Sequence, residues 1–366
     1  MGHVKAAEAI TAAFAERHPD VTVRNVNVLQ FARPAFRFFY ENGYNFISSH
    51  WTKFWGFLYR RYDRPARHGM LVSLTRWAME RPLLRYVREY RPDFIIGTHP
   101  MPTRLLAHVS DKNIAAIPTA VVVTDYGCHS FWVDEATDRY FVSTEDVRRC
   151  LGGFRVPPER VAVTGIPVQP KFARPIDAAA ARRSLKLPER VPIVLVIGGL
   201  LSAGYLERLV PLVRAHAPGT QFLLVTGRDH WLRSQLKRST LPGTDGVSVY
   251  GFVQNMEELL AACDVVITKA GGLTVSECLA MGAVMAIPSA IPGQEEDNLA
   301  FLLRHKVAVS AHAPDQLADA VAPLLTDAKL AAERKSACRS LGKPNAAYDL
   351  AADVVRQIET RASRVG

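Results

Sequence analysis

The residues best suited to chemistry in this sequence follow a short apolar run, DVVIT, at residues 264–268. Gly271 and Gly272 come next and allow a sharp turn, and the residues from Thr274 to Met281 have the pattern of a helix. A strand, a glycine turn and a helix N-terminus together form an anion site, because free backbone N–H groups and the helix dipole face the turn. The turn therefore suits a phosphate group.

Polar side chains near this turn suit the rest of a nucleotide sugar. Glu277 lies in the first turns of the predicted helix, where its carboxylate can accept hydrogen bonds from the hydroxyls of a ribose. A second apolar run, VMAIP, leads to PGQEEDN, whose Gln294 and Glu295 are placed to bind sugar hydroxyls. Glycines after a strand are also common in ordinary tight turns, so the complete pattern over residues 269–298 is more specific than any part of it.

This pattern resembles the donor-nucleotide site of glycosyltransferases with two Rossmann domains, the GT-B fold. The group most like it is family 28, which holds monogalactosyldiacylglycerol synthases, processive diacylglycerol glucosyltransferases and the lipid-II-forming GlcNAc transferase. In that group an (A/S)G-x-x-T-x-x-E segment holds diphosphate and ribose, and a P-x-Q-x-x-x-N-like segment holds the sugar. The resemblance implies diphosphate at Gly271, Gly272 and Thr274, ribose at Glu277, and donor sugar at Gln294 and Glu295.

Two further positions follow from the same resemblance. IGGLLSAG, at residues 197–204, is a second glycine turn at a helix start, and the resemblance implies that Gly199 faces the bound UDP. By itself such a glycine motif is a weak signal. Phe252 and Val253, in GFV after a predicted strand, match the place where family members receive uracil through backbone groups.

Polar residues at two strand ends indicate the acceptor side. FIIGTH and AVVVTD read as strands that end at His99 and Asp125, and ligands of open α/β sheets bind beyond the carboxyl ends of strands. The segment TDYGCHSFW resembles the family's TD-x-x-x-H-x-x-W segment, which implies acceptor-side roles for His129 and Trp132. A lone His or Asp in a loop is more often a cap or surface residue, but two at strand ends within this motif favour function.

The resemblance implies a single inverting displacement that yields a β-glycoside, with a side-chain base that takes the proton of the acceptor hydroxyl. His3 and Asp125 are the candidate bases, and the sequence does not choose between them. Family members begin with a strand and a glycine-rich loop ending in Gly-His, of which Gly2 and His3 are present. We therefore expect an N-terminal sheet without its first strand, a poorly held His3, and slower transfer than in a version extended upstream.

The positive charge is concentrated in residues 31–91. The net charge is +10, and this segment holds twelve Arg and Lys against four acidic residues, together with 16 of the 32 aromatic residues. Interleaved aromatics and cations favour a surface at a lipid headgroup layer over a helical pair with an aromatic core. Because no nucleic-acid motif accompanies the charge, nucleic acid is not an expected partner. The residues expected to contact lipid are Trp51, Trp55, Arg60 and Arg61.

Strands and helices alternate along the chain, which predicts an α/β protein with parallel sheets. We expect two Rossmann-like domains facing a cleft, with an additional N-terminal strand over VTVRNVNV at 21–28. The predicted parts are an acceptor and membrane-binding domain (1–168), a linker (169–192), a UDP-sugar-binding domain (193–344) and a C-terminal helix crossing back to the first domain (345–366).

Composition sets the expected compartment. The five cysteines, an odd number without a CxxC pair, favour a reducing cytoplasm with thiols in the core. No apolar run approaches the roughly 20 residues of a transmembrane helix, so we expect a peripheral protein on the inner face of the cell membrane. The sequence has no Asp-x-Asp pair, and neither metal nor other cofactor is expected.

The leading hypothesis is hexose transfer from a UDP-hexose to diacylglycerol at a membrane with anionic lipids. One alternative is a GlcNAc transferase acting on a polyprenyl-linked peptidoglycan precursor. The other is a weakened homologue that only binds membrane and nucleotide. TDYGCHSFW and the aromatic-basic segment favour diacylglycerol, and the intact donor motif argues against a pure binder. Glucose or galactose as donor, and processivity, stay open.

Overall fold

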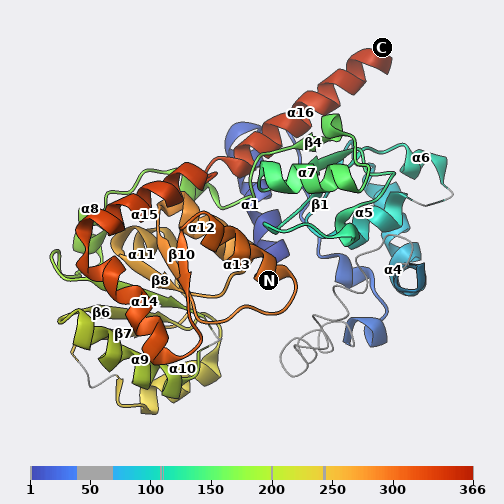
Figure 1. The fold of residues 1–366 in the computed structure, drawn as a ribbon. Coiled ribbons are helices and arrows are strands. Elements are labelled where there is room, and N and C mark those ends of the chain that lie inside the picture. The colour runs from blue at the N-terminus through green and yellow to red at the C-terminus, as the bar shows by residue number, and fades with distance from the viewer. Residues whose placement is uncertain are drawn as a thin grey trace. The chain divides into compact units, whose positions relative to one another are not determined.

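The computed structural model describes residues 2–38, 69–107, 109, 111–198, 201–241 and 245–365. It divides into two compact units. The N-unit comprises Met1–Pro170, Ile291–Asp297 and Asn345–Gly366, and the C-unit comprises Lys171–Ala290 and Asn298–Pro344. Each unit contains its own parallel sheet, as the alternation of strands and helices predicts (Figure 1).

The N-unit sheet has four parallel strands in the order β1-β2-β3-β4. Its strands are β1 (Ile95–Gly97), β2 (Thr119–Val122), β3 (Arg139–Phe141) and β4 (Val161–Ala162). Every residue of β2 is buried, which is why this stretch is a continuous apolar run and not an alternating one. Because all four strands run the same way, their carboxyl ends lie along one edge of the sheet.

Helices surround this sheet and connect its strands. The helices of the N-unit are α1 (Gly2–Arg17), α4 (Gly69–Tyr90), α5 (Pro100–Ala107), α6 (Lys112–Ala115), α7 (Glu145–Gly153) and α16 (Ala346–Val365). Short 3-10 turns are η1 (Val28–Phe31), η3 (Ser130–Trp132) and η4 (Pro158–Arg160), and η5 (Pro170–Ala173) begins at the last residue of the first N-unit segment along the chain.

The first and last helices pack together on the N-unit sheet, so that blue α1 and red α16 lie side by side in Figure 1. Ile10 and Phe14 of α1 and Leu350 and Val354 of α16 share a buried cluster with residues of β2 and β3, including Phe141. Apolar residues at helical spacing on both helices produce this packing. Residues from opposite ends of the chain therefore complete one core.

The predicted strand at 21–28 is wrong. The structure assigns no strand to these described residues, and the 3-10 turn η1 begins at Val28. Val21 and Val23 are partly buried against the cluster shared by α1 and α16. Alternating residues can bury one face by packing alone, whereas a strand also needs a hydrogen-bonded neighbour. Among the described residues, the edge strand β1 pairs only with β2, so residues 21–28 have no strand to pair with.

The C-unit sheet has six parallel strands in the order β10-β9-β8-β5-β6-β7. Its strands are β5 (Ile193–Ile197), β6 (Gln221–Val225), β7 (Val247–Tyr250), β8 (Val265–Ile267), β9 (Val284–Ile287) and β10 (Ala308–Ser310). Its helices are α8 (Ala178–Ser184), α9 (Ala203–His216), α10 (His230–Arg238), α11 (Met256–Ala262), α12 (Gly272–Met281), α14 (Pro314–Thr326) and α15 (Ala328–Leu341), while α13 (Gln294–Arg304) spans the boundary between the units.

The strand order of the C-unit reverses at β5. From β5 the chain builds outward through β6 and β7, and then returns to place β8 on the other side of β5. In open parallel sheets, ligands bind beyond the carboxyl ends of the strands at such a switch point. The fold thereby marks the ends of β5 and β8 as the expected ligand site.

Candidate functional site

The glycine turn after β8 is held by a buried asparagine. Gly271 is the N-cap of α12, with φ −74° and ψ 130°, and no side chain of the described residues caps this helix start. Asn298 is completely buried, and its Nδ2 donates a hydrogen bond to the carbonyl oxygen of Ala270 at 2.8 Å. The turn is therefore fixed from the strand side, and the first N–H groups of α12 are not occupied by a side-chain cap.

Two polar side chains predicted to bind the nucleotide lie on α12. Thr274 and Glu277 are three residues apart, so they share one side of the helix, and both are half-buried. Gly272 and Ser276 are buried, and the Ser276 hydroxyl bonds back to the Gly272 carbonyl at 2.8 Å. The binding of diphosphate and ribose at these residues stays a prediction that the geometry permits.

A second turn lies beside the first at the switch point. β5 ends at Ile197, and Gly198 follows with φ +78°, a left-handed conformation that favours glycine. Helix α9 then starts at a Ser202 cap, whose side chain accepts from the Tyr205 N–H. Because β5 pairs directly with β8, both turns lie at the same edge of the C-unit sheet. Gly199, the predicted UDP contact, lies outside the described residues.

The predicted uracil position follows β7. Phe252 is 54% exposed, and the guanidinium of Arg228 lies 5.3 Å from the centroid of its ring. Val253 is half-buried next to it. β6 and β7 pair in parallel, so Arg228 and Phe252 both follow the carboxyl ends of neighbouring strands. Uracil binding at these two residues stays a prediction.

In the N-unit, His3 is held at the ends of β1 and β2. Its Nδ1 lies 2.8 Å from the carbonyl oxygen of Thr98 and 3.2 Å from the Oγ1 of Thr124. A carbonyl oxygen only accepts, so Nδ1 carries the proton and Nε2 has the free lone pair. Within the described ranges, Nε2 has no hydrogen-bond partner. The expectation that His3 is poorly held is wrong, because α1 packs against α16 and fixes it.

Two aromatic residues predicted for the acceptor side contact His3. Its ring meets that of His99 edge-on, with 4.9 Å between the centroids, and lies 6.1 Å from the ring of Trp132. Burial lowers the pKa of His3 below its ordinary value. Burial, with a smaller contribution from the charge of His3, lowers the pKa of His99 to about 3. Both imidazoles are therefore neutral near pH 7, the form in which a histidine accepts a proton.

Asp125 and Gln294 meet within the N-unit. Asp125 is buried, and one of its carboxylate oxygens accepts a hydrogen bond from Nε2 of Gln294 at 3.1 Å. Glu295 is also buried, and its carboxylate accepts from the backbone N–H of Ile291 at 3.1 Å. The structure thus brings a candidate base together with a residue predicted to bind the donor sugar. The roles of all three side chains stay predictions.

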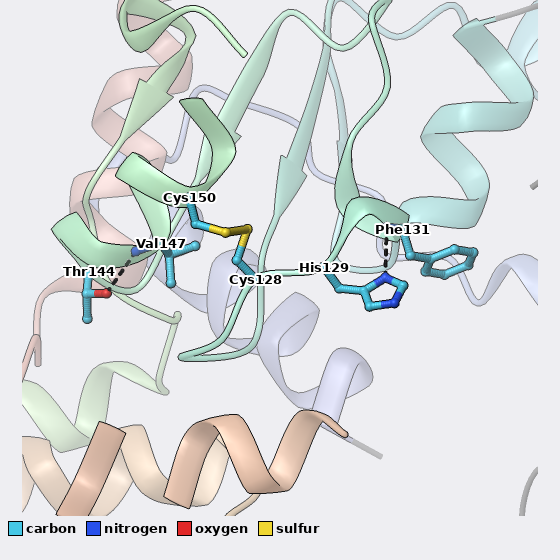
Figure 2. Close-up of a disulfide and its surroundings, with 6 residues drawn as sticks. All are labelled: Cys128, His129, Phe131, Thr144, Val147 and Cys150. Carbon is cyan, nitrogen blue, oxygen red and sulfur yellow. Dashed lines mark hydrogen bonds between the residues drawn. A yellow bond between two sulfur atoms is a disulfide. The ribbon is translucent and has the colours of Figure 1, made fainter. Parts of the chain in front are cut away.

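His129 and its neighbours are organised by local bonds. The Nδ1 of His129 accepts from the N–H of Phe131 at 3.0 Å and so caps η3 (Figure 2). Arg104, which the sequence analysis did not single out, is buried and pairs with Asp134 at 3.3 Å while its guanidinium faces the Phe131 ring. An isolated arginine between two predicted strands gives no sequence signal for this role. Arg104 therefore stabilises the segment that carries His129 and Trp132.

A disulfide ties the same segment to α7. Cys128 bonds to Cys150, across a sequence separation of 22 residues, and Figure 2 shows the bond joining the loop to the helix. Cys263, Cys278 and Cys338 are free and buried. The expectation that all five cysteines are thiols in the core is therefore wrong for two of them. The inference of a reducing compartment from the cysteine pattern loses its basis.

The described part of the chain was searched for metal-binding groups and for membrane-spanning helices. No group of three or more His, Cys, Asp or Glu side chains there is arranged to hold a metal ion. Within the same ranges, no helix has the length and apolar character needed to cross a bilayer. The predicted lipid contacts Trp51, Trp55, Arg60 and Arg61 lie outside these residues.

Comparisons with known proteins agree with this geometry. Solved structures share the fold: MurG of Acinetobacter baumannii has a TM-score of 0.54 at 17% identity, covering 76% of this chain and 77% of that one. A putative UDP-N-acetylglucosamine 2-epimerase of Listeria monocytogenes has a TM-score of 0.59 at 12% identity, covering 79% and 80%. The two parallel sheets therefore form Rossmann-like domains of the GT-B class.

Matches to family models give a more specific assignment than the shared fold. Residues 3–168 match the model described as monogalactosyldiacylglycerol (MGDG) synthase, and residues 193–353 match the glycosyltransferase family 28 C-terminal domain. The chain belongs to the family 28 glycosyltransferases. It is 28% identical over 275 residues to a processive diacylglycerol beta-glucosyltransferase of Bacillus licheniformis, covering 75% of this chain and 71% of the relative. The Bacillus pumilus enzyme of the same name is 29% identical over 273 residues, covering 74% and 70%.

Proposed function

We propose that this chain transfers a hexose from a UDP-sugar to diacylglycerol and forms a β-glycolipid. The observation that carries the proposal is the uncapped turn at Gly271, pinned by the buried Asn298, in a chain that matches two glycolipid and glycosyltransferase family models. The donor side is supported further by its place at the switch point of the C-unit sheet. The acceptor side is supported by the names of the relatives in Bacillus.

The proposed chemistry is one displacement at the anomeric carbon. The acceptor hydroxyl forms the new C–O bond while the bond to the UDP oxygen breaks. The N–H groups at the start of α12 stabilise the negative charge that develops on the departing diphosphate. His3 takes the hydroxyl proton on Nε2, because this nitrogen is neutral and has no hydrogen-bond partner in the described structure. Asp125, which accepts from Gln294, is then an orienting residue and the second candidate base.

The donor and acceptor are tested together by a transfer assay. Purified full chain is incubated with UDP-glucose or UDP-galactose and vesicles that contain diacylglycerol, and the lipid product is analysed by mass spectrometry and by NMR of the anomeric proton. The proposal expects a β-linked hexosyl diacylglycerol. A parallel assay offers UDP-GlcNAc with a polyprenyl-linked peptidoglycan precursor. Transfer to that acceptor and none to diacylglycerol would show that the acceptor assignment is wrong.

Glu277→Ala should weaken UDP binding by about 1–3 kcal/mol, because ribose hydroxyls would lose a carboxylate acceptor in a half-buried site. Isothermal titration with UDP measures this loss. Glu296→Ala is a suitable control, since the Glu296 carboxylate accepts from the Gly293 N–H in the N-unit and is not a predicted nucleotide contact. Equal UDP affinity for the Glu277 variant and the wild type would remove the ribose assignment.

We infer that the surface beside α4 binds anionic lipid. Phe38, Leu74 and Trp77 are 64%, 49% and 60% exposed, and the guanidinium of Arg33 lies 4.0 Å from the Trp77 ring centroid. Leu74 and Trp77 are three residues apart on α4, so they share one side of the helix. Exposed aromatics beside cations suit the boundary between headgroups and acyl chains. These residues belong to the segment 31–91, in which the sequence concentrates its charge.

Trp77→Ala should reduce the amount of protein that pellets with anionic vesicles, and added salt should reduce pelleting of the wild type, since screening acts over about 8 Å at physiological salt. The matched control is Trp231→Ala, because Trp231 is 68% exposed but lies on α10 of the C-unit. Co-sedimentation of both variants with anionic and zwitterionic vesicles gives the comparison. Equal losses for both tryptophans would show that any exposed tryptophan adsorbs to vesicles nonspecifically, and would contradict a lipid-binding role for this surface.

A further inference from the structure

We propose that Thr124 is a positioning residue for sugar transfer, and that its hydroxyl and the Thr98 carbonyl together hold His3 with the proton on Nδ1. The inference rests on the proposed function, because it states how the proposed base is oriented. The Oγ1 of Thr124 lies 3.2 Å from Nδ1 of His3, and the Thr98 oxygen lies 2.8 Å from the same nitrogen. One N–H thus faces two oxygen acceptors.

Both oxygens are fixed by the fold. Thr124 is 6% exposed, and the backbone on either side of it is held: the Val123 N–H donates to the Phe141 carbonyl at 2.9 Å, and the Asp125 carbonyl accepts from the Ser143 hydroxyl at 2.8 Å. The other acceptor depends on Gly97, the last residue of β1. A Cβ at Gly97 would lie 2.7 Å from a Thr103 methyl and 3.0 Å from the His99 carbonyl, so only glycine fits there.

This arrangement has a chemical consequence during transfer. When Nε2 takes the acceptor proton, the ring becomes an imidazolium, and the bonds from Nδ1–H to oxygen strengthen because the donor is then charged. A carboxylate performs this task in the serine hydrolase triad. Here the two acceptors are neutral, so they fix the tautomer and stabilise the charged ring without holding it protonated beforehand. That suits a half-buried base that must be neutral before each turnover.

The kinetic test compares Thr124→Val with Thr124→Ser and with Thr11→Val. Thr124→Val should lower kcat about 5- to 10-fold, the effect of losing one hydrogen bond in the transition state, with the KM for UDP-sugar unchanged. Thr124→Ser keeps the hydroxyl and should restore most of kcat. Thr11 lies on the same helix as His3 but bonds to the Ala7 carbonyl, so its valine variant should match the wild type. Unchanged kcat in Thr124→Val, or equal losses in the Val and Ser variants, would overturn the proposal.

A second readout needs no activity. NMR of isotope-labelled histidine nitrogens distinguishes the two neutral tautomers, and the His3 signals are assigned by their loss in His3→Gln. The substrate-free wild type should show the proton on Nδ1 of His3, and Thr124→Val should shift this signal while leaving the His99 tautomer unchanged. A wild-type His3 with its proton on Nε2 would overturn the inference. Absence of transfer by a chain with the expected tautomer would instead contradict the proposed function.

Discussion

His3→Gln should lower kcat by about 10²- to 10⁴-fold, the usual contribution of a general base. Glutamine preserves a polar side chain of similar reach but has no basic nitrogen. The KM for UDP-sugar should stay the same, because His3 lies in the N-unit, whereas the predicted nucleotide contacts all belong to the C-unit. Initial rates of hexosyl diacylglycerol formation at saturating donor measure the effect.

The pH dependence gives an independent check on His3. Burial lowers the pKa of His3 below its ordinary 6.5, so the neutral form persists to lower pH than for an exposed histidine. The wild-type kcat/KM should therefore stay level as the pH falls to 6.5 and decline only below it. His18→Gln, at the end of the same helix, is the matched control and should behave as the wild type. A loss of less than 10-fold in His3→Gln would leave Asp125 as the stronger candidate base.

Cys150→Ser should lower the free energy of unfolding by about 3 kcal/mol, because the disulfide to Cys128 closes a loop with a sequence separation of 22 residues and so restricts the unfolded chain. Urea unfolding without reductant measures the difference. Reductant should destabilise the wild type by the same amount and have no further effect on the variant. The denatured, unreduced wild type should show three reactive thiols, from Cys263, Cys278 and Cys338. Five reactive thiols would contradict the disulfide.

Much of the C-unit was predictable because its signals are local. A helix start was expected at the glycine turn of residues 197–204, and α9 indeed begins at Ala203, where the Ser202 side chain caps it. β8, the turn at Gly271 and α12 were likewise expected in this order, although the helix begins at Gly272, before Thr274. A buried parallel strand needs a continuous apolar run and a sharp turn needs glycine, and both signals depend only on residues that are adjacent in the sequence.

The strand predicted at 21–28 shows that local signals do not predict which strands pair. Its alternation of residues is real, and Val21 and Val23 do bury one side against the core. Pairing, however, depends on a neighbouring strand that the residues themselves do not specify. The cysteines show the same limit, since their number and spacing gave no sign that Cys128 and Cys150 would meet.

By itself the sequence determined the class of fold, the glycine turn before α12 and the polar residues at the strand ends. Only the tertiary structure decided how His3 is held. Its two oxygen partners are 95 and 121 residues away along the chain, and they reach it because β1 and β2 are paired in parallel and α1 packs against α16. Such contacts form when separate elements bury their apolar faces together. A local sequence pattern therefore cannot predict which side chains come into contact.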